Sequence, residues 1–164
     1  MKTVNLLLGS SERCVNNLVE AAVRDVCYPH AVVECSRVQH IDEFLRQGRG
    51  QWANLIFLAP DHLLPMGTRR GSRLEADEVA NAIREIRARH SIPVFAVNVA
   101  DENKTPLLEA GANNTFAFPL PLDALKAEVR RELNLSEAEP AEPAPNRPAL
   151  ASFLARGWQL LRQA

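Results

Sequence analysis

The sequence of 164 residues is long enough to form one domain with a substantial hydrophobic core. Its hydrophobic fraction of 46% and charged fraction of 24% are ordinary for a globular domain, and its net charge of −1 argues against a nucleic-acid-binding protein. The three cysteines, Cys14, Cys27 and Cys35, form no C-x-x-C pair, which predicts small buried side chains in a reducing, cytoplasmic compartment rather than a disulfide framework or a metal site.

The first third of the chain alternates short apolar runs with helical patterns. Residues 4–9 form an apolar run that predicts a buried parallel strand and is too short for a signal peptide or a membrane span. Apolar residues then recur at helical spacing until Tyr28-Pro29-His30 breaks the helix. Residues 31–35 and 54–58 predict two further strands, with a short helix over residues 40–46 between them. The apolar face of the first helix consists of Val15, Leu18, Val19, Ala22 and Val26.

A long polar stretch, residues 60–74, precedes the next helix. Ser72 and Glu75 have capping-box spacing, which predicts that this helix begins at Ser72. Apolar residues at helical spacing continue it to about residue 90.

The remainder of the chain continues the alternation. Residues 92–97 and 115–118 predict the fourth and fifth strands. Thr105-Pro106 predicts the N-cap and first turn of a short helix that Gly111 terminates. Pro121 opens a last helix that continues to about residue 135.

This order of elements predicts an α/β fold, a flavodoxin-like (βα)5 doubly wound parallel sheet, over residues 1–135. Residues 136–148 are rich in Pro, Glu and Ala and predict an extended linker. Residues 149–164 predict an amphipathic C-terminal helix. Its apolar stripe consists of Leu150, Phe153, Leu154, Trp158 and Leu161.

Local motifs within the predicted domain resemble those of response-regulator receiver (CheY-like) domains. Residues 54–58, Asn-Leu-Ile-Phe-Leu, are similar to the family's third strand, which ends in the phosphate-accepting aspartate. Residues 86–94 resemble its third helix running into its fourth strand, and residues 109–112, Glu-Ala-Gly-Ala, resemble the segment before its fifth strand. Phe118-Pro119-Leu120 matches the family's K-P-F apart from the lysine, and the resemblance covers residues 4–135.

The resemblance implies a phosphorylation site that this sequence does not supply. The family places an acidic pair for Mg²⁺ after the first strand, an aspartate nucleophile after the third, and Ser/Thr and Lys after the fourth and fifth. We therefore expect a phosphorylation-deficient pseudo-receiver that is not an enzyme and needs no cofactor or metal. Asp61, two residues past the nucleophile position, is disfavoured as a displaced acceptor because no acidic partner or lysine accompanies it, and it is expected to be a loop carboxylate beside Pro60. The degenerate positions are Gly9, Ser10, Ala59, Asn98 and Phe118.

An alternative function uses the loop Gly9-Ser10-Ser11, which follows a first strand and opens a helix. Doubly wound folds bind phosphates at this place, so a small-molecule or nucleotide-binding domain is a second hypothesis. The loop has one glycine and no Walker lysine, and it also suits a simple helix N-cap. His62 beside Asp61 has no further catalytic group next to it, and the four histidines have no metal-ligand spacing.

The expected function is therefore phosphorylation-independent signalling or scaffolding through protein partners in a bacterial pathway, with homo-oligomerisation open and neither nucleic acid nor membrane as a partner. The resemblance implies a partner surface on the fourth helix, fifth strand and fifth helix, which contains Leu107, Leu108, Phe116 and Leu122. The C-terminal stripe, with Phe153, Leu154, Trp158 and Leu161, binds a partner, binds its own domain or, least favoured, lies on a membrane. The polar stretch is longer than its counterpart in the family and is either a basic contact loop or a solvated one; its arginines are Arg69, Arg70 and Arg73.

Overall fold

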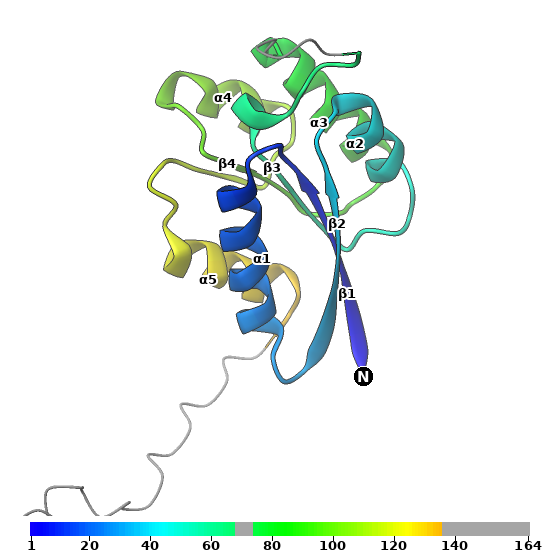
Figure 1. Cartoon of the computed structure of the whole chain (residues 1–164), viewed down its shortest axis with the longest axis vertical. Coiled ribbons are helices and arrows are strands. Elements are labelled where there is room, and N and C mark those ends of the chain that lie inside the picture. The colour runs from blue at the N-terminus through cyan, green and yellow to red at the C-terminus, as the bar shows by residue number, and fades with distance from the viewer. Residues whose placement is uncertain (68–73, 136–164) are drawn as a thin grey trace, which may run out of the picture.

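A computed structural model describes residues 1–67 and 74–135 (Figure 1). Its five strands are β1 (Lys2–Gly9), β2 (Ala31–Val38), β3 (Leu55–Leu58), β4 (Val94–Val97) and β5 (Asn114–Phe116). Its helices are α1 (Arg13–Cys27), α2 (Ile41–Gly48), the 3₁₀ turn η1 (Pro60–His62), α3 (Ala76–Arg89), α4 (Asp101–Glu109) and α5 (Leu122–Glu132).

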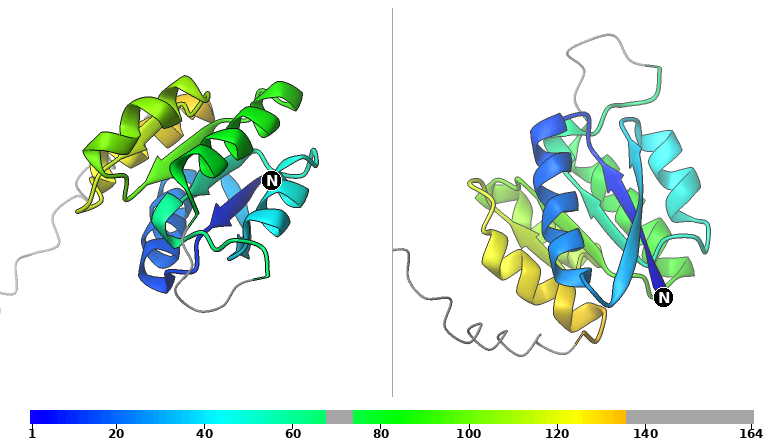
Figure 2. Two further views of the ribbon diagram at one scale, coloured as in Figure 1. Left: turned by 90° about the horizontal axis from the view of Figure 1, so that it is seen from above. Right: turned by 60° about the horizontal axis from the view of Figure 1, so that its bottom comes forward.

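The strands form one parallel sheet in the order β2-β1-β3-β4-β5. Helices α1 and α5 cover one face, and α2, α3 and α4 cover the other (Figures 1 and 2). The predicted flavodoxin-like (βα)5 fold is therefore confirmed. Among the described residues, none of the helices is both long enough and apolar enough to cross a membrane.

The central strands are apolar throughout because both of their faces are buried. In β1, Leu6 and Leu8 pack toward α1 and α5, whereas Leu7 packs toward the helices on the opposite face. In β3, Phe57 packs toward α1 and α5, and Ile56 packs toward the opposite face. This explains why the runs at residues 4–9 and 54–58 lack the polar alternation of a half-exposed strand.

Several expected boundaries were wrong. Strand β2 continues to Val38 rather than ending at residue 35, and β4 begins at Val94 rather than at residue 92. Helix α3 begins at Ala76, where Glu75 is the N-cap and its amide donates to the Glu78 carboxylate over 2.8 Å, so the box lies three residues later than expected. Helix α4 begins at Asp101 and contains Pro106 in its interior, because the acidic Asp101 and Glu102 already favour a helix start there. Strand β5 ends at Phe116, two residues earlier than predicted.

Helix α1 also departs from the expected burial at its N-terminal half. Leu18 is 46% exposed rather than part of the buried face, and Cys14 is exposed although all three cysteines were expected to be buried. Both side chains line a surface groove described below. Burial raises the pKa of the Cys27 thiol, and burial together with Glu20 raises the pKa of Cys35 to about 11, so these two remain protonated thiols.

Gly9 has a packing role that the sequence did not reveal. A Cβ atom built on Gly9 would lie 2.6 Å from Cδ2 of Phe44, a fully buried aromatic of α2. Any side chain at residue 9 would therefore have to displace this ring. The close approach of Phe44 accounts for the glycine at the end of β1 without any bound phosphate.

We expect Gly9→Ala to destabilise the domain by about 1–3 kcal/mol through overpacking. Phe44→Ala should cost about 3–5 kcal/mol through the cavity it leaves. The double variant should cost clearly less than the sum, because removal of the ring makes room for the new methyl group. Urea unfolding of the four proteins measures this cycle, and strictly additive costs would contradict the proposed contact.

The division of the chain at residue 135 is a further prediction. The described strands and helices supply a hydrophobic cluster on each face of the sheet. We therefore expect a fragment of residues 1–135 to unfold cooperatively in urea, and limited proteolysis of the full chain to cut first within residues 136–148 or 60–74. A molten or insoluble fragment would mean that the last segment belongs to the core.

Candidate functional site

The carboxyl edge of the sheet brings together the five positions that the resemblance singled out. Gly9 ends β1, Ala59 follows β3, Asn98 follows β4, and Phe118 lies in the loop between β5 and α5. Carboxyl ends of parallel strands share one edge of the sheet, which is where open α/β folds place their binding sites. This edge is therefore the candidate site, and its geometry decides what it can bind.

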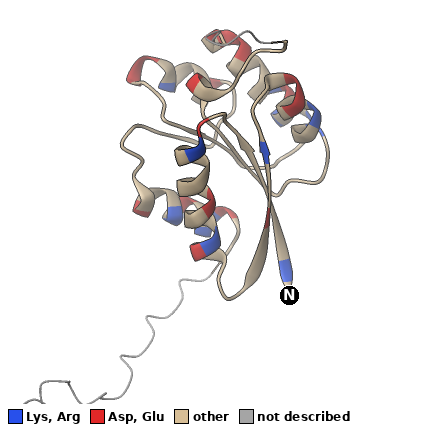
Figure 3. Ribbon diagram, in the orientation of Figure 1, with Lys and Arg blue, Asp and Glu red and all other residues tan. Residues whose placement is uncertain are grey.

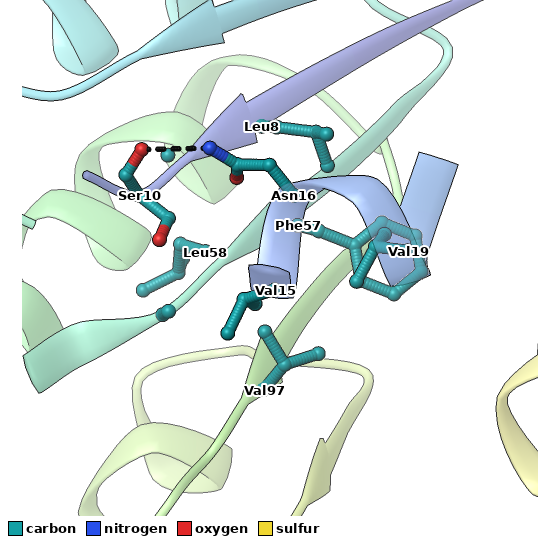
Figure 4. Close-up of a pocket in the computed structure, with 10 residues that line it drawn as sticks. Leu8, Ser10, Val15, Asn16, Val19, Phe57, Leu58 and Val97 are labelled. Atoms are coloured by element: carbon teal, nitrogen blue, oxygen red, sulfur yellow. Dashed lines mark hydrogen bonds between the residues drawn. The ribbon is translucent and has the colours of Figure 1, made fainter. Parts of the chain in front are cut away.

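The space between the ends of β1 and β3 is almost completely filled. A hollow of about 10 Å³ remains there, lined by Gly9, Ser10 and Ala59 together with apolar side chains from α1, β3 and β4 (Figure 4). This volume is at the lower limit for a single water molecule. This hollow is therefore too small for a phosphoryl group or a hydrated cation. The other lining residues are Leu8, Val15, Asn16, Val19, Phe57, Leu58 and Val97.

Backbone hydrogen bonds join the loops that follow β1 and β3 beside this hollow. The Ser11 amide donates to the His62 carbonyl over 2.6 Å and thereby ties the loop after β1 to the 3₁₀ turn after β3. The Ala59 amide donates to the Gly9 carbonyl over 2.9 Å, and Ala59 is fully buried. The nucleophile position is thus an apolar methyl group in the core, with no oxygen to accept a phosphoryl group.

Four amides between the end of β1 and the first turn of α1 already donate to internal acceptors. These four donors are not free to cradle a phosphate at this helix N-terminus, and the Glu12 carboxylate places negative charge there. This weakens the hypothesis of a nucleotide-binding loop. The bonds are Ser10 N to Val38 O (2.9 Å), Ser11 N to His62 O (2.6 Å), Glu12 N to Ser10 Oγ (3.0 Å) and Cys14 N to Glu12 Oε1 (3.2 Å).

The residues present do not fit the magnesium ion that the resemblance implies. Gly9 and Ser10 offer no carboxylate, and Glu12 spends one carboxylate oxygen on the N-terminal turn of α1. Asp61 is exposed on η1 and lines a separate hollow of about 310 Å³ together with Asp101. Among residues 1–67 and 74–135, no group of three His, Cys, Asp or Glu side chains could hold a metal ion.

Asn98 occupies the Ser/Thr position in an unusual backbone conformation. Its φ of +55° lies in the left-handed region, which Asn tolerates and β-branched residues strongly disfavour. The next amide, that of Val99, donates to the Phe116 carbonyl over 3.0 Å and holds the turn against β5. A threonine, one of the residue types that the family has at this position, would therefore be strained here.

Phe118 is exposed and lines a larger groove at this edge of the sheet. It is 79% exposed, and its ring contributes to the lining of a groove of about 430 Å³ between the start of α1 and the loop after β5. Sequence reasoning singled out Asn98 and Phe118 but missed the groove itself, because Leu18 was assigned to the buried face of α1. We call this the edge groove, and its lining residues are Glu12, Cys14, Val15, Leu18, His62, Asn98, Phe118 and Leu120.

The expected partner surface on α4, β5 and α5 needs correction. Leu107 and Phe116 are buried in the core, 1% and 4% exposed, because they anchor α4 and β5 to the rest of the sheet. Leu108 is 44% exposed and Leu122 is partly buried, so only these two offer a side chain to a partner. The remaining expected contact residues lie outside the described part of the chain; they are Phe153, Leu154, Trp158, Leu161, Arg69, Arg70 and Arg73.

Comparison with solved structures places the fold among receiver domains. The chain is 20% identical to the receiver domain of a sensor histidine kinase from Pseudomonas aeruginosa, with a TM-score of 0.59 over 80% of this chain and 98% of that chain. It is 14% identical to the receiver domain of a DNA-binding response regulator from Colwellia psychrerythraea, with a TM-score of 0.58 over 80% and 98% of the two chains.

A third similar structure is described as an atypical orphan response regulator with a phosphorylation-independent regulatory mechanism. It is 14% identical, with a TM-score of 0.56 over 81% of this chain and 98% of that chain. No family model matches the sequence, and no curated protein matches it. At these identities the likeness establishes the receiver fold alone.

The backbone at Asn98 generates a testable prediction. Asn98→Gly should leave the free energy of unfolding unchanged or raise it, since glycine adopts a positive φ without strain. Asn98→Thr should lower it by about 1–2 kcal/mol, although threonine is the family's residue type. Urea denaturation compares the two variants, and equal stability would show that residue 98 is not held in the left-handed region.

Proposed function

We propose that this chain is a receiver-type signalling domain that acts by binding protein partners and does not accept a phosphoryl group. The observation that carries the proposal is the filled carboxyl edge, where Ala59 is fully buried beside a hollow of about 10 Å³. Phosphoryl transfer to a receiver needs a carboxylate nucleophile and a Mg²⁺ site of hard oxygen ligands. Neither fits the residues present at this edge.

More than one of the residues needed for phosphoryl transfer is missing, which supports the proposal that the domain does not accept a phosphoryl group. Restoration of an aspartate at residue 59 alone would bury an unpaired carboxylate, because the neighbouring backbone groups are already bonded to each other. The glycine at residue 9 is fixed by Phe44, so an acidic residue there would clash with the core. The similar structure described as phosphorylation-independent supports the same interpretation.

A domain of this kind signals through binding equilibria. In a receiver that is phosphorylated, covalent modification biases the conformation of the domain. Here a partner shifts the populations of conformations only by its difference in affinity for them. We place this activity in a bacterial two-component pathway in the cytoplasm, with a protein as the partner.

Incubation with acetyl phosphate and Mg²⁺ tests the proposal. Intact-mass spectrometry of the full chain should detect no acid-stable, base-labile phosphoryl adduct, because Ala59 has no nucleophilic oxygen. A conventional receiver domain treated in parallel should give the adduct and serves as the positive control.

Asp61→Asn provides the matched variant for this experiment. An adduct on the natural chain that disappears in Asp61→Asn would identify Asp61 as a displaced acceptor and contradict the proposal. An adduct that persists in Asp61→Asn would contradict it as well, with the acceptor elsewhere.

A further inference from the structure

The edge groove is an apolar surface that no described residue covers. Phe118 and Leu18, 79% and 46% exposed, both line it, together with Leu120. The other large exposed apolar residues of the described chain do not line this groove. Apolar side chains gathered around a groove of about 430 Å³ have the character of a binding site for an aromatic or aliphatic anchor.

The rim of this groove is acidic. Glu12 lines the groove, and Asp61 and Asp101 line the adjoining hollow that shares Asn98 and Phe118 with it. No Lys or Arg is among the described residues that line either space, although Lys104 pairs with Asp101 over 2.7 Å. Figure 3 shows the acidic positions just before α1 and at the start of α4, with the basic Arg13 directly after Glu12. The site therefore suits an apolar segment that carries positive charge.

Residues 149–164 of the same chain have this chemistry. They contain the apolar residues Phe153 and Trp158, two arginines, Arg156 and Arg162, and no Asp or Glu. Aromatic and arginine side chains are the residue types enriched where binding energy concentrates. Charge and apolar character thus match the acidic rim and apolar lining of the edge groove.

The intervening chain is long enough to deliver this segment. Leu120 lines the groove at the N-terminal end of α5, and Leu135 follows its C-terminal end. The eleven residues of α5 span about 16 Å at 1.5 Å per residue, so the path back to the groove is on the order of 20 Å. Residues 136–148 reach up to about 40 Å when extended.

We propose that residues 149–164 dock in the edge groove of their own domain, with an aromatic anchor against Phe118 and Leu18 and arginines beside Glu12 and Asp61. A short tether gives the segment an effective concentration in the millimolar range near the groove, which favours docking in the same chain over a second copy. If the proposed function holds, a protein partner competes with this segment for the groove, and displacement of the segment replaces phosphorylation as the switch. The docking itself does not depend on that function.

Trp158 fluorescence reports the docking directly. Trp52→Phe leaves Trp158 as the only tryptophan of the full chain. In that background, emission should be blue-shifted relative to the urea-unfolded protein, and Phe118→Ala should move it to the solvent-like position. Tyr28→Ala is the matched control, because Tyr28 is also an aromatic that is 79% exposed and precedes a proline, but lies at the opposite edge of the sheet.

Cys14 provides an independent measurement in the full chain. It is exposed and lines the edge groove, whereas Cys27 is buried and Cys35 has its pKa raised to about 11. Docking should shield Cys14 from iodoacetamide, and Trp158→Ala should accelerate its alkylation by about tenfold or more. Peptide mass spectrometry assigns the alkylated cysteine, and far-UV circular dichroism verifies that each variant is folded.

Each alternative occupant or site gives a distinct result that would overturn the proposal. Solvent-like Trp158 emission, or equal Cys14 alkylation in the natural chain and Trp158→Ala, would mean that the segment does not dock. Emission sensitive to Tyr28→Ala but not Phe118→Ala would place the segment at the opposite edge. Shielding that disappears on about hundredfold dilution would identify a second copy as the occupant. None of these readouts involves phosphorylation, so failure here leaves the test of the proposed function separate.

Discussion

At the carboxyl edge of the sheet, the ends of β1 and β3 are held in direct contact. The Ala59 amide donates to the Gly9 carbonyl, and the Ser11 amide donates to the His62 carbonyl in the next loop. Phe44 packs against Gly9 from the other face, where a Cβ atom would lie 2.6 Å from the ring. These contacts use the space and the backbone donors that a doubly wound fold ordinarily presents to a ligand. The remaining features of the candidate site follow from this closure.

One consequence is that this edge lacks the groups for phosphoryl transfer, whereas the edge groove beside it still offers a surface for binding. The groove beside this edge is lined by exposed apolar side chains from α1 and from the loop after β5. Glu12 also lines it, and Asp61 lines the adjoining hollow. These side chains offer contact area and charge, and among the described residues they include no set of ligands that could hold a metal ion. The fold therefore retains a surface suited to a polypeptide, which is why both proposals concern protein segments as ligands.

Much of the fold could be predicted because burial on both faces of a parallel sheet leaves a strong local signal. The apolar runs of β1 and β3 and the break at Tyr28-Pro29 are visible in short stretches of sequence. The start of α4 was mispredicted because Pro106 looked like a first-turn proline, whereas the helix tolerates it in its interior. Local sequence patterns indicate more than one possible start for a helix such as α4, but they do not determine which start the chain adopts.

The candidate site was only partly predictable, because its decisive contacts are long-range. The five degenerate positions could be assigned from matching motifs, but the reason for Gly9 lies in Phe44, far along the chain. The exposure of Leu18 depends on how α5 and its preceding loop sit beside α1, which the periodicity of α1 alone does not encode. The left-handed backbone of Asn98 likewise reflects the turn between β4 and α4.

The central claim is that the carboxyl edge cannot bind a phosphoryl group with its metal ion. A titration of the ¹⁵N-labelled full chain with Mg²⁺ and beryllofluoride, a mimic of the phosphoryl group, tests this claim directly by NMR. The account predicts that the amide resonances of Ser10, Ser11, Ala59 and His62 stay in place, because these amides donate to internal acceptors around a filled hollow. Saturable shifts of those resonances that require both Mg²⁺ and beryllofluoride would contradict it.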